Sequence, residues 1–88
     1  MHESKLVANL VDEGVRIAKL NDSDTIHEMR VSIGALSHVT PVSLETHLQE
    51  ATPGTLIEHA EFTITKSTDP YAPDALDVRL VSITIGEG

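Results

Sequence analysis

Apolar and polar residues repeat with a helical period at the start of the chain and with a strand period after it. Between Ser4 and Leu20 the apolar residues form one stripe with a period of about 3.6 residues, which predicts an amphipathic helix. They are Leu6, Val7, Leu10, Val11, Ile17 and Ala18. Asn21 and the polar residues after it are typical of a helix end and a turn. Within Ile26–Ile33 apolar and polar residues alternate from Met29 onward, which predicts a strand with one buried face.

The second half of the chain predicts another helix and two more strands. Thr40 before Pro41 is the pattern of a helix N-cap followed by proline at the first helical position, and a Pro-Gly pair ends this helix. Alternation returns over Ala60–Thr65, which predicts a second strand. The last strand, Val78–Ile85, changes phase near Leu80, as a β-bulge or burial of both faces would cause.

The predicted order is therefore helix, strand, helix, strand, strand. We expect an α+β fold in which two helices pack on one face of a small three-stranded sheet, with residues 1–88 forming a single domain. The polar turn Asp69–Asp74 separates the last two strands. Because strands that follow one another usually pair, we expect these two to form an antiparallel hairpin.

The amino-acid composition argues against several classes of protein and of function. With 40% apolar residues among 88, the chain is too hydrophobic to be disordered, and it has no apolar run long enough to cross a membrane. A formal charge of −8 argues against binding to nucleic acid. The absence of cysteine excludes disulfides, a thiolate nucleophile and Cys-ligated zinc. No secretory signal pattern opens the sequence, so we expect a cytoplasmic protein.

The histidines are the candidates for chemistry. His27 and His59 fall on the polar side of predicted strands, which is typical of solvated side chains. His47 lies at the edge of the apolar stripe of the second helix, where a partly buried packing residue is the expected role. His38 lies in a loop, a better place for function. No nucleophile with a base and no Gly-rich phosphate loop accompanies them, so no catalytic residue is predicted.

His2 differs from the others because of its place in the chain. The Met1 amine, the His2 amide nitrogen and the His2 imidazole Nδ1 can close adjoining five- and six-membered chelate rings on one metal ion. Planar nitrogen donors favour Ni(II) or Cu(II) over tetrahedral zinc. A fourth position remains for Glu3, water or a partner's ligand, which suits a carrier that passes its metal on. The alternative is that His2 is an ordinary residue of a frayed terminus.

Four segments, in this order, resemble the HypA/HybF family of nickel metallochaperones. The segments are Met1-His2-Glu3, Val31–Pro41 (VSIGALSHVTP), Ala51–Thr55 (ATPGT) and Ala60–Ile64 (AEFTI). They lie within about the first 65 residues, and each would be weak alone. The family helps to mature nickel–iron hydrogenases and, in some organisms, urease. The chain departs from the family between the last two predicted strands, where family members insert a zinc module with two C-x-x-C pairs. Lys66–Asp74 contains no cysteine, so no zinc is expected.

The resemblance implies that the chain carries Ni(II). His2 would supply the imidazole and amide ligands and Met1 the amine, with Glu3 at or beside the coordination sphere. The implied partners are a maturation GTPase and a hydrogenase or urease precursor, with no nucleic acid and no membrane. The alternative is a metal-free adaptor that keeps the scaffold to bind a partner or to form a homodimer. A small enzyme using His38 or His47 is a third reading, without partner residues. The client enzyme, and the choice of nickel over copper or cobalt, stay open.

Overall fold

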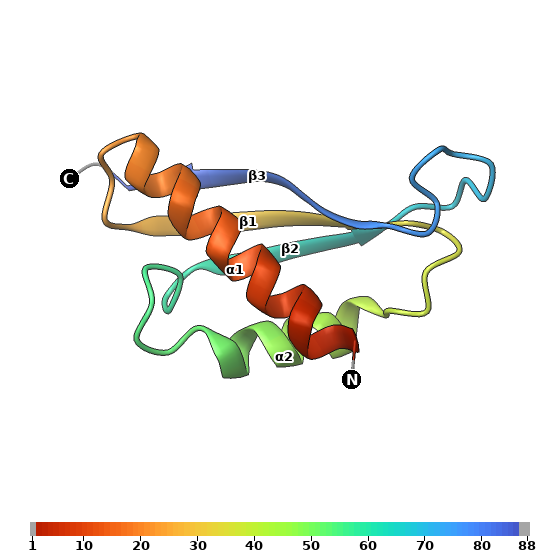
Figure 1. Ribbon diagram of the computed structural model, residues 1–88, viewed down its shortest axis with the longest axis horizontal. Coiled ribbons are helices and arrows are strands. Elements are labelled where there is room, and N and C mark those ends of the chain that lie inside the picture. Colours follow the sequence, from red (N-terminus) through yellow and green to blue (C-terminus); the bar gives the residue numbers. More distant parts are fainter. Residues whose placement is uncertain (1, 87–88) are drawn as a thin grey trace.

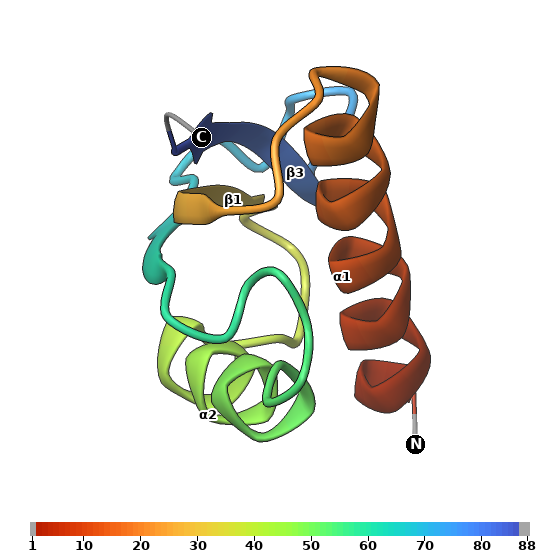
Figure 2. The same cartoon turned by 90° about the vertical axis from the view of Figure 1, so that its left-hand side faces the viewer.

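The computed structural model describes residues 2–86, with side chains from Ser4 onward. Its elements follow in the order α1 (His2–Leu20), β1 (Ile26–Ile33), α2 (Pro41–Ala51), β2 (Glu61–Lys66) and β3 (Val78–Ile85). The predicted α+β fold and its order of elements are confirmed. Both helices lie on the same side of the sheet, with α1 beside β3 and α2 nearer β2 (Figures 1 and 2). Among residues 2–86, no helix has the length and apolar character needed to span a bilayer.

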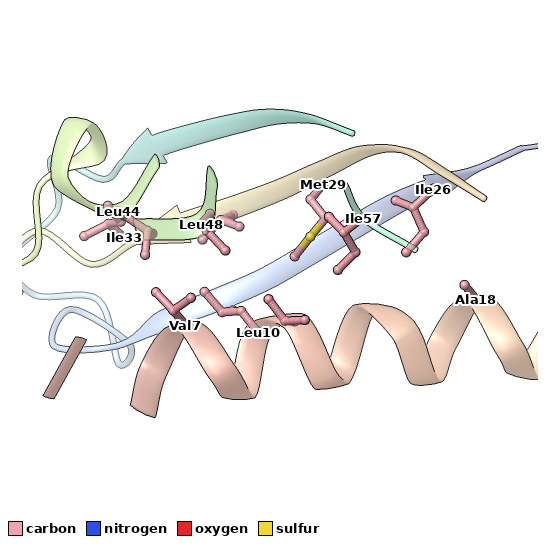
Figure 3. Packing of buried hydrophobic residues seen from close by; sticks show 11 residues of the cluster. Val7, Leu10, Ala18, Ile26, Met29, Ile33, Leu44, Leu48 and Ile57 are labelled. Carbon is pink, nitrogen blue, oxygen red and sulfur yellow. The ribbon is translucent and has the colours of Figure 1, made fainter. Parts of the chain in front are cut away.

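The core lies between β1 and the two helices. Four side chains of β1 are 1% exposed or less, namely Ile26, Met29, Val31 and Ile33. Leu44 and Leu48 of α2 meet this row from one side, and buried residues of α1 such as Val7 and Leu10 meet it from the other (Figure 3). The predicted alternation of β1 is therefore the pattern of a strand with one buried face.

The expected hairpin of β2 with β3 is wrong. The strand order is β2-β1-β3, so β1 separates the two strands that were predicted to pair. β1 pairs with β2 in parallel and with β3 in antiparallel orientation. The physical reason is burial, since β1, whose apolar side chains are the most deeply buried of the three strands, gains a neighbour on each side when it is central. The segment that contains α2 supplies the crossover that a parallel pair requires.

A β-bulge explains the change of phase in β3. Arg30 of β1 lies opposite Ser82, whereas the next residue, Val31, lies opposite Leu80, so Val81 is the extra residue. Val81 points away from the core and is 59% exposed. The half-buried apolar residues before and after it consequently share the inner face. Of the two explanations that the sequence allowed, the bulge is confirmed and burial of both faces is not.

Local signals at the two helices also agree with the structure. The Thr40 side chain accepts a hydrogen bond of 3.2 Å from the Ser43 amide, which confirms the predicted N-cap of α2. Gly14, inside α1, lies where a Cβ would come within 3.3 Å of Ile57 Cδ1 and 3.6 Å of Met29 Cε. The glycine thus lets α1 approach the core closely at this point, in spite of its low helix propensity.

The core assignment predicts the effect of truncating its side chains. Leu44→Ala, Leu48→Ala and Val31→Ala should each lower the free energy of unfolding by about 2–5 kcal/mol, because each opens a cavity in a closely packed interior. Urea denaturation measures this loss. Val42→Ala is the matched control, since Val42 lies on the same helix as the two leucines but is 76% exposed. Midpoints near that of the wild type for all three core variants would contradict the assignment.

Candidate metal centre

The predicted nickel ligands belong to the very start of α1. Met1 lies outside the described residues, and so do the side chains of His2 and Glu3, whereas α1 begins at His2. The first four N–H groups of a helix have no acceptor within that helix. The His2 amide is one of these groups, so a metal ion can replace its proton without breaking a helical hydrogen bond. The local fold is therefore compatible with the predicted chelate.

A cleft of about 430 Å³ opens between α1 and α2. Its lining residues are Ser4, Val7, Ala8, Val11 and Asp12 of α1 and His47, Glu50 and Ala51 of α2. The cleft is thus lined by both small aliphatic and polar or ionisable side chains. The start of α1 lies beside α2 in both ribbon views (Figures 1 and 2). The cleft therefore extends along α1 from its first turn, at Ser4, to Asp12.

The other histidines are dispersed. His27, His38 and His59 are exposed, which agrees with the expectation of solvated side chains for His27 and His59. His47 is exposed as well, so its expected role as a partly buried packing residue is wrong, and it lines the cleft instead. Between Ser4 and Gly86, no group of three or more His, Cys, Asp or Glu side chains is placed to hold a metal ion. The structure does not bring His38 and His47 into a common site of that kind.

The face of the sheet that points away from the helices carries a polar network around Glu28. The Thr63 hydroxyl donates a hydrogen bond of 2.6 Å to the Glu28 carboxylate, and Arg30 Nε lies 3.5 Å from the other carboxylate oxygen. The hydrogen bond from Thr63 holds the pKa of Glu28 below its ordinary value, and the charge of Arg30 acts in the same direction. The hydrogen bond from Thr63 links β2 to β1, whereas Arg30 lies in the same strand as Glu28, so this carboxylate has a structural role.

The connection between β2 and β3 is the segment where the resemblance led us to expect a departure from the family. Both of its stems are held by consecutive residues at the end of β1: the Ser67 amide donates to the Ile33 carbonyl at 2.8 Å, and the Gly34 amide donates to the Asp77 carbonyl at 2.7 Å. Tyr71, at the tip, is 93% exposed. Residues 67–77 therefore turn around the end of β1, and the polar turn that was expected to close a hairpin lies within a crossover (Figure 1).

Comparison with known proteins gives one family match. The family described as "HypA: Hydrogenase/urease nickel incorporation, metallochaperone, hypA" matches residues 1–71. The chain belongs to the HypA family. It is thus a nickel-incorporation metallochaperone and not an enzyme. The match ends at Tyr71, inside the connection between β2 and β3.

Solved structures support the same fold. The solution structure of the Ni metallochaperone HypA from Helicobacter pylori superimposes with a TM-score of 0.80 at 18% identity, covering 94% of this chain and 96% of that one. A second solution structure, of HypA protein, gives a TM-score of 0.73 at 22% identity, covering 97% and 96% of the two chains. At these identities the likeness concerns the fold. No curated protein sequence matches the chain.

Gly34 tests how the connection is anchored. A Cβ at this position would collide with the backbone carbonyl groups of Asp74 and Ala75. Gly34→Ala should therefore displace the connection, lower the unfolding free energy by about 1–3 kcal/mol and speed hydrogen exchange at the Leu36 amide, which donates to Ala75. Thr68→Ala, an exposed substitution in the same connection, is the control. Unchanged exchange in Gly34→Ala would contradict this anchoring.

Chelation tests whether any metal holds the fold together. The chain has no cysteine, and its core is built from aliphatic side chains and one methionine. The melting temperature should therefore stay the same when the protein is treated with EDTA. Thermal unfolding followed by circular dichroism measures this, with EDTA saturated with Ca²⁺ as the control for ionic strength. A large fall in the melting temperature would reveal a structural metal.

Proposed function

We propose that this chain binds one Ni(II) ion at its N-terminus and delivers it to a nickel–iron hydrogenase or urease precursor during maturation, directly or through a maturation GTPase. The ligands are the Met1 amine, the His2 amide nitrogen and the His2 imidazole, with Glu3 at or beside the fourth position. The observation that carries this proposal is the sequence Met1-His2-Glu3, of which His2 is the first residue of α1, in a chain of the HypA family.

Two features of the chain support nickel at this end. The part of the fold between Ser4 and Gly86 offers no cluster of three metal-ligating side chains, so a tight site needs donors from the N-terminus. The formal charge of −8 attracts divalent cations to the protein. A nitrogen-rich plane then selects among them in favour of Ni(II) or Cu(II).

The same chemistry suggests how the metal leaves. Three donors from two adjacent residues occupy three positions of a square plane, and the fourth can exchange without disturbing the core. A ligand from the receiving protein can enter at that position before the chelate rings open. Protonation of the amine and amide then favours release, since these groups must lose protons to bind the metal.

Isothermal titration with Ni(II) tests the proposal on the untagged chain. We expect one Ni(II) per chain, with affinity that rises as the pH increases through neutrality because binding displaces protons. His2→Ala and an N-terminal extension of a few residues should both abolish tight binding, because each removes a donor. Glu3→Ala should have a smaller effect. The bound Ni(II) should be diamagnetic and weakly yellow, as planar nitrogen coordination makes it low-spin.

His59→Ala is the matched control, since His59 is exposed and far in sequence from the N-terminus. Equal nickel affinity in the wild type, His2→Ala and the extended form would place the ligands elsewhere. A wild type that binds no nickel would instead fit the metal-free adaptor that keeps the same scaffold.

A further inference from the structure

We propose that a groove along α1 is the docking site for an amphipathic helix of a partner protein, one that carries lysine or arginine beside its apolar face. The groove consists of the cleft between α1 and α2 and of a second hollow that continues it along α1. The proposal does not involve nickel, so it is tested separately from the N-terminal metal site.

Two hollows on the same flank of α1 join to form this groove. The first is the cleft of about 430 Å³ between α1 and α2. The second has a volume of about 360 Å³ and lies between the later turns of α1 and residues 54–56. Val11 and Asp12 line both hollows, which therefore adjoin. The groove extends from Ser4 to Lys19, which is about 22 Å, or four turns, of helix.

The floor of the groove is apolar. Val7 and Val11 are only 3% and 8% exposed, and Leu56 of the segment after α2 is partly buried against the core. Ala8 of α1 and Ala51 of α2 are exposed and line the cleft. Their small side chains allow another helix to come close, because the distance between packed helices depends on the side chains at the contact.

The walls of the groove favour a helix over an extended segment. Among the described residues, those that line it come from α1, α2 and the segment after α2, and none comes from a strand. An extended segment would find no strand edge here, so its buried backbone groups would lack partners. A helix satisfies its own backbone groups, and an apolar stripe at three- or four-residue spacing matches a groove of this length.

The charges beside the apolar floor indicate the sign of the partner. Asp12 of α1 and Glu50 of α2 line the cleft from its two walls, and both are exposed. Lysine or arginine at the border of the partner's apolar face would lie against these carboxylates. A second copy of the chain is a poorer occupant, because its formal charge of −8 would be repelled.

Three synthetic peptides test the groove on the chain after treatment with EDTA. The first is a fluorescein-labelled peptide of about 15 residues with leucine on one helical face and lysine at the borders of that face. The second has the same composition with its leucines scattered, and the third has glutamate in place of lysine. Fluorescence anisotropy at physiological salt measures binding. The first peptide should bind at least about tenfold more tightly than either of the others.

Charge reversal at the groove is the decisive variant. Asp12→Lys with Glu50→Lys should weaken binding of the lysine peptide at least about tenfold and strengthen binding of the glutamate peptide. Glu13→Lys with Glu45→Lys is the matched control. It changes the net charge equally on the same two helices, at exposed positions that do not line the groove, and should alter the affinity by less than about threefold.

A change of size at the groove tests its shape without changing its charge. Ala8→Gln places a longer side chain over the apolar floor and should also weaken binding of the lysine peptide. Asn9→Gln, at the next position of α1, is the control because Asn9 faces β3 instead. Circular dichroism checks that each variant is folded. If Ala8→Gln does not fold, the two charge-reversed variants still decide the question.

The results that would overturn the proposal are distinct. A wild type that binds none of the peptides excludes the docking site. Equal affinity for the patterned and scattered peptides excludes a helix site, and equal weakening by the two charge-reversed variants reduces the attraction to net charge. Analytical ultracentrifugation of the chain alone covers the remaining occupant: a dimer that Ala8→Gln dissociates would mean that a second copy fills the groove.

Discussion

The buried face of β1 is the constraint on which the rest of the structure depends. Both helices pack on its row of apolar side chains, and its backbone pairs with a strand at each edge. Every other element is therefore placed relative to this strand. The two helices cover different parts of the same row. Where they diverge, they leave the cleft at the start of α1. The cleft between the helices therefore follows from the way one strand is buried.

Much of the fold could be predicted because its signals are local. The alternation in β1, the Thr40 cap before Pro41 and the change of phase near Leu80 each depend on neighbouring residues. The pairing of strands is different, since it depends on which strand loses most water when it becomes central. The side chain of Ile57 shows the same limit: it is 0% exposed although it lies in an irregular segment between α2 and β2, where periodicity gives no signal.

The candidate site likewise has a part that depends on neighbouring residues and a part that depends on the packing of the helices. The proposed donors of Met1 and His2 come from the sequence alone, because the two residues are covalently adjacent and adjacency alone sets the chelate rings. The position of His47 could not, because one helix's periodicity does not show how far the neighbouring helix covers its edge. His47 is three residues from the buried Leu44, yet it is exposed and lines the cleft. The relative placement of α1 and α2 decided this, and that placement is a property of the whole core.

The two stems of the 67–77 connection are held by Ile33 and Gly34, next to each other at the end of β1. With both stems held by backbone hydrogen bonds, the connection joins β2 to β3 whatever residues lie between the stems. The tip of the connection can be replaced by other segments there, since neither the strands nor the helices depend on the sequence of the tip. The surface at this end of the sheet can thus change while the helices and the core keep their packing. The fold thus separates changes in the connection from changes in the helices, and a function carried by the connection can be lost while the fold is kept.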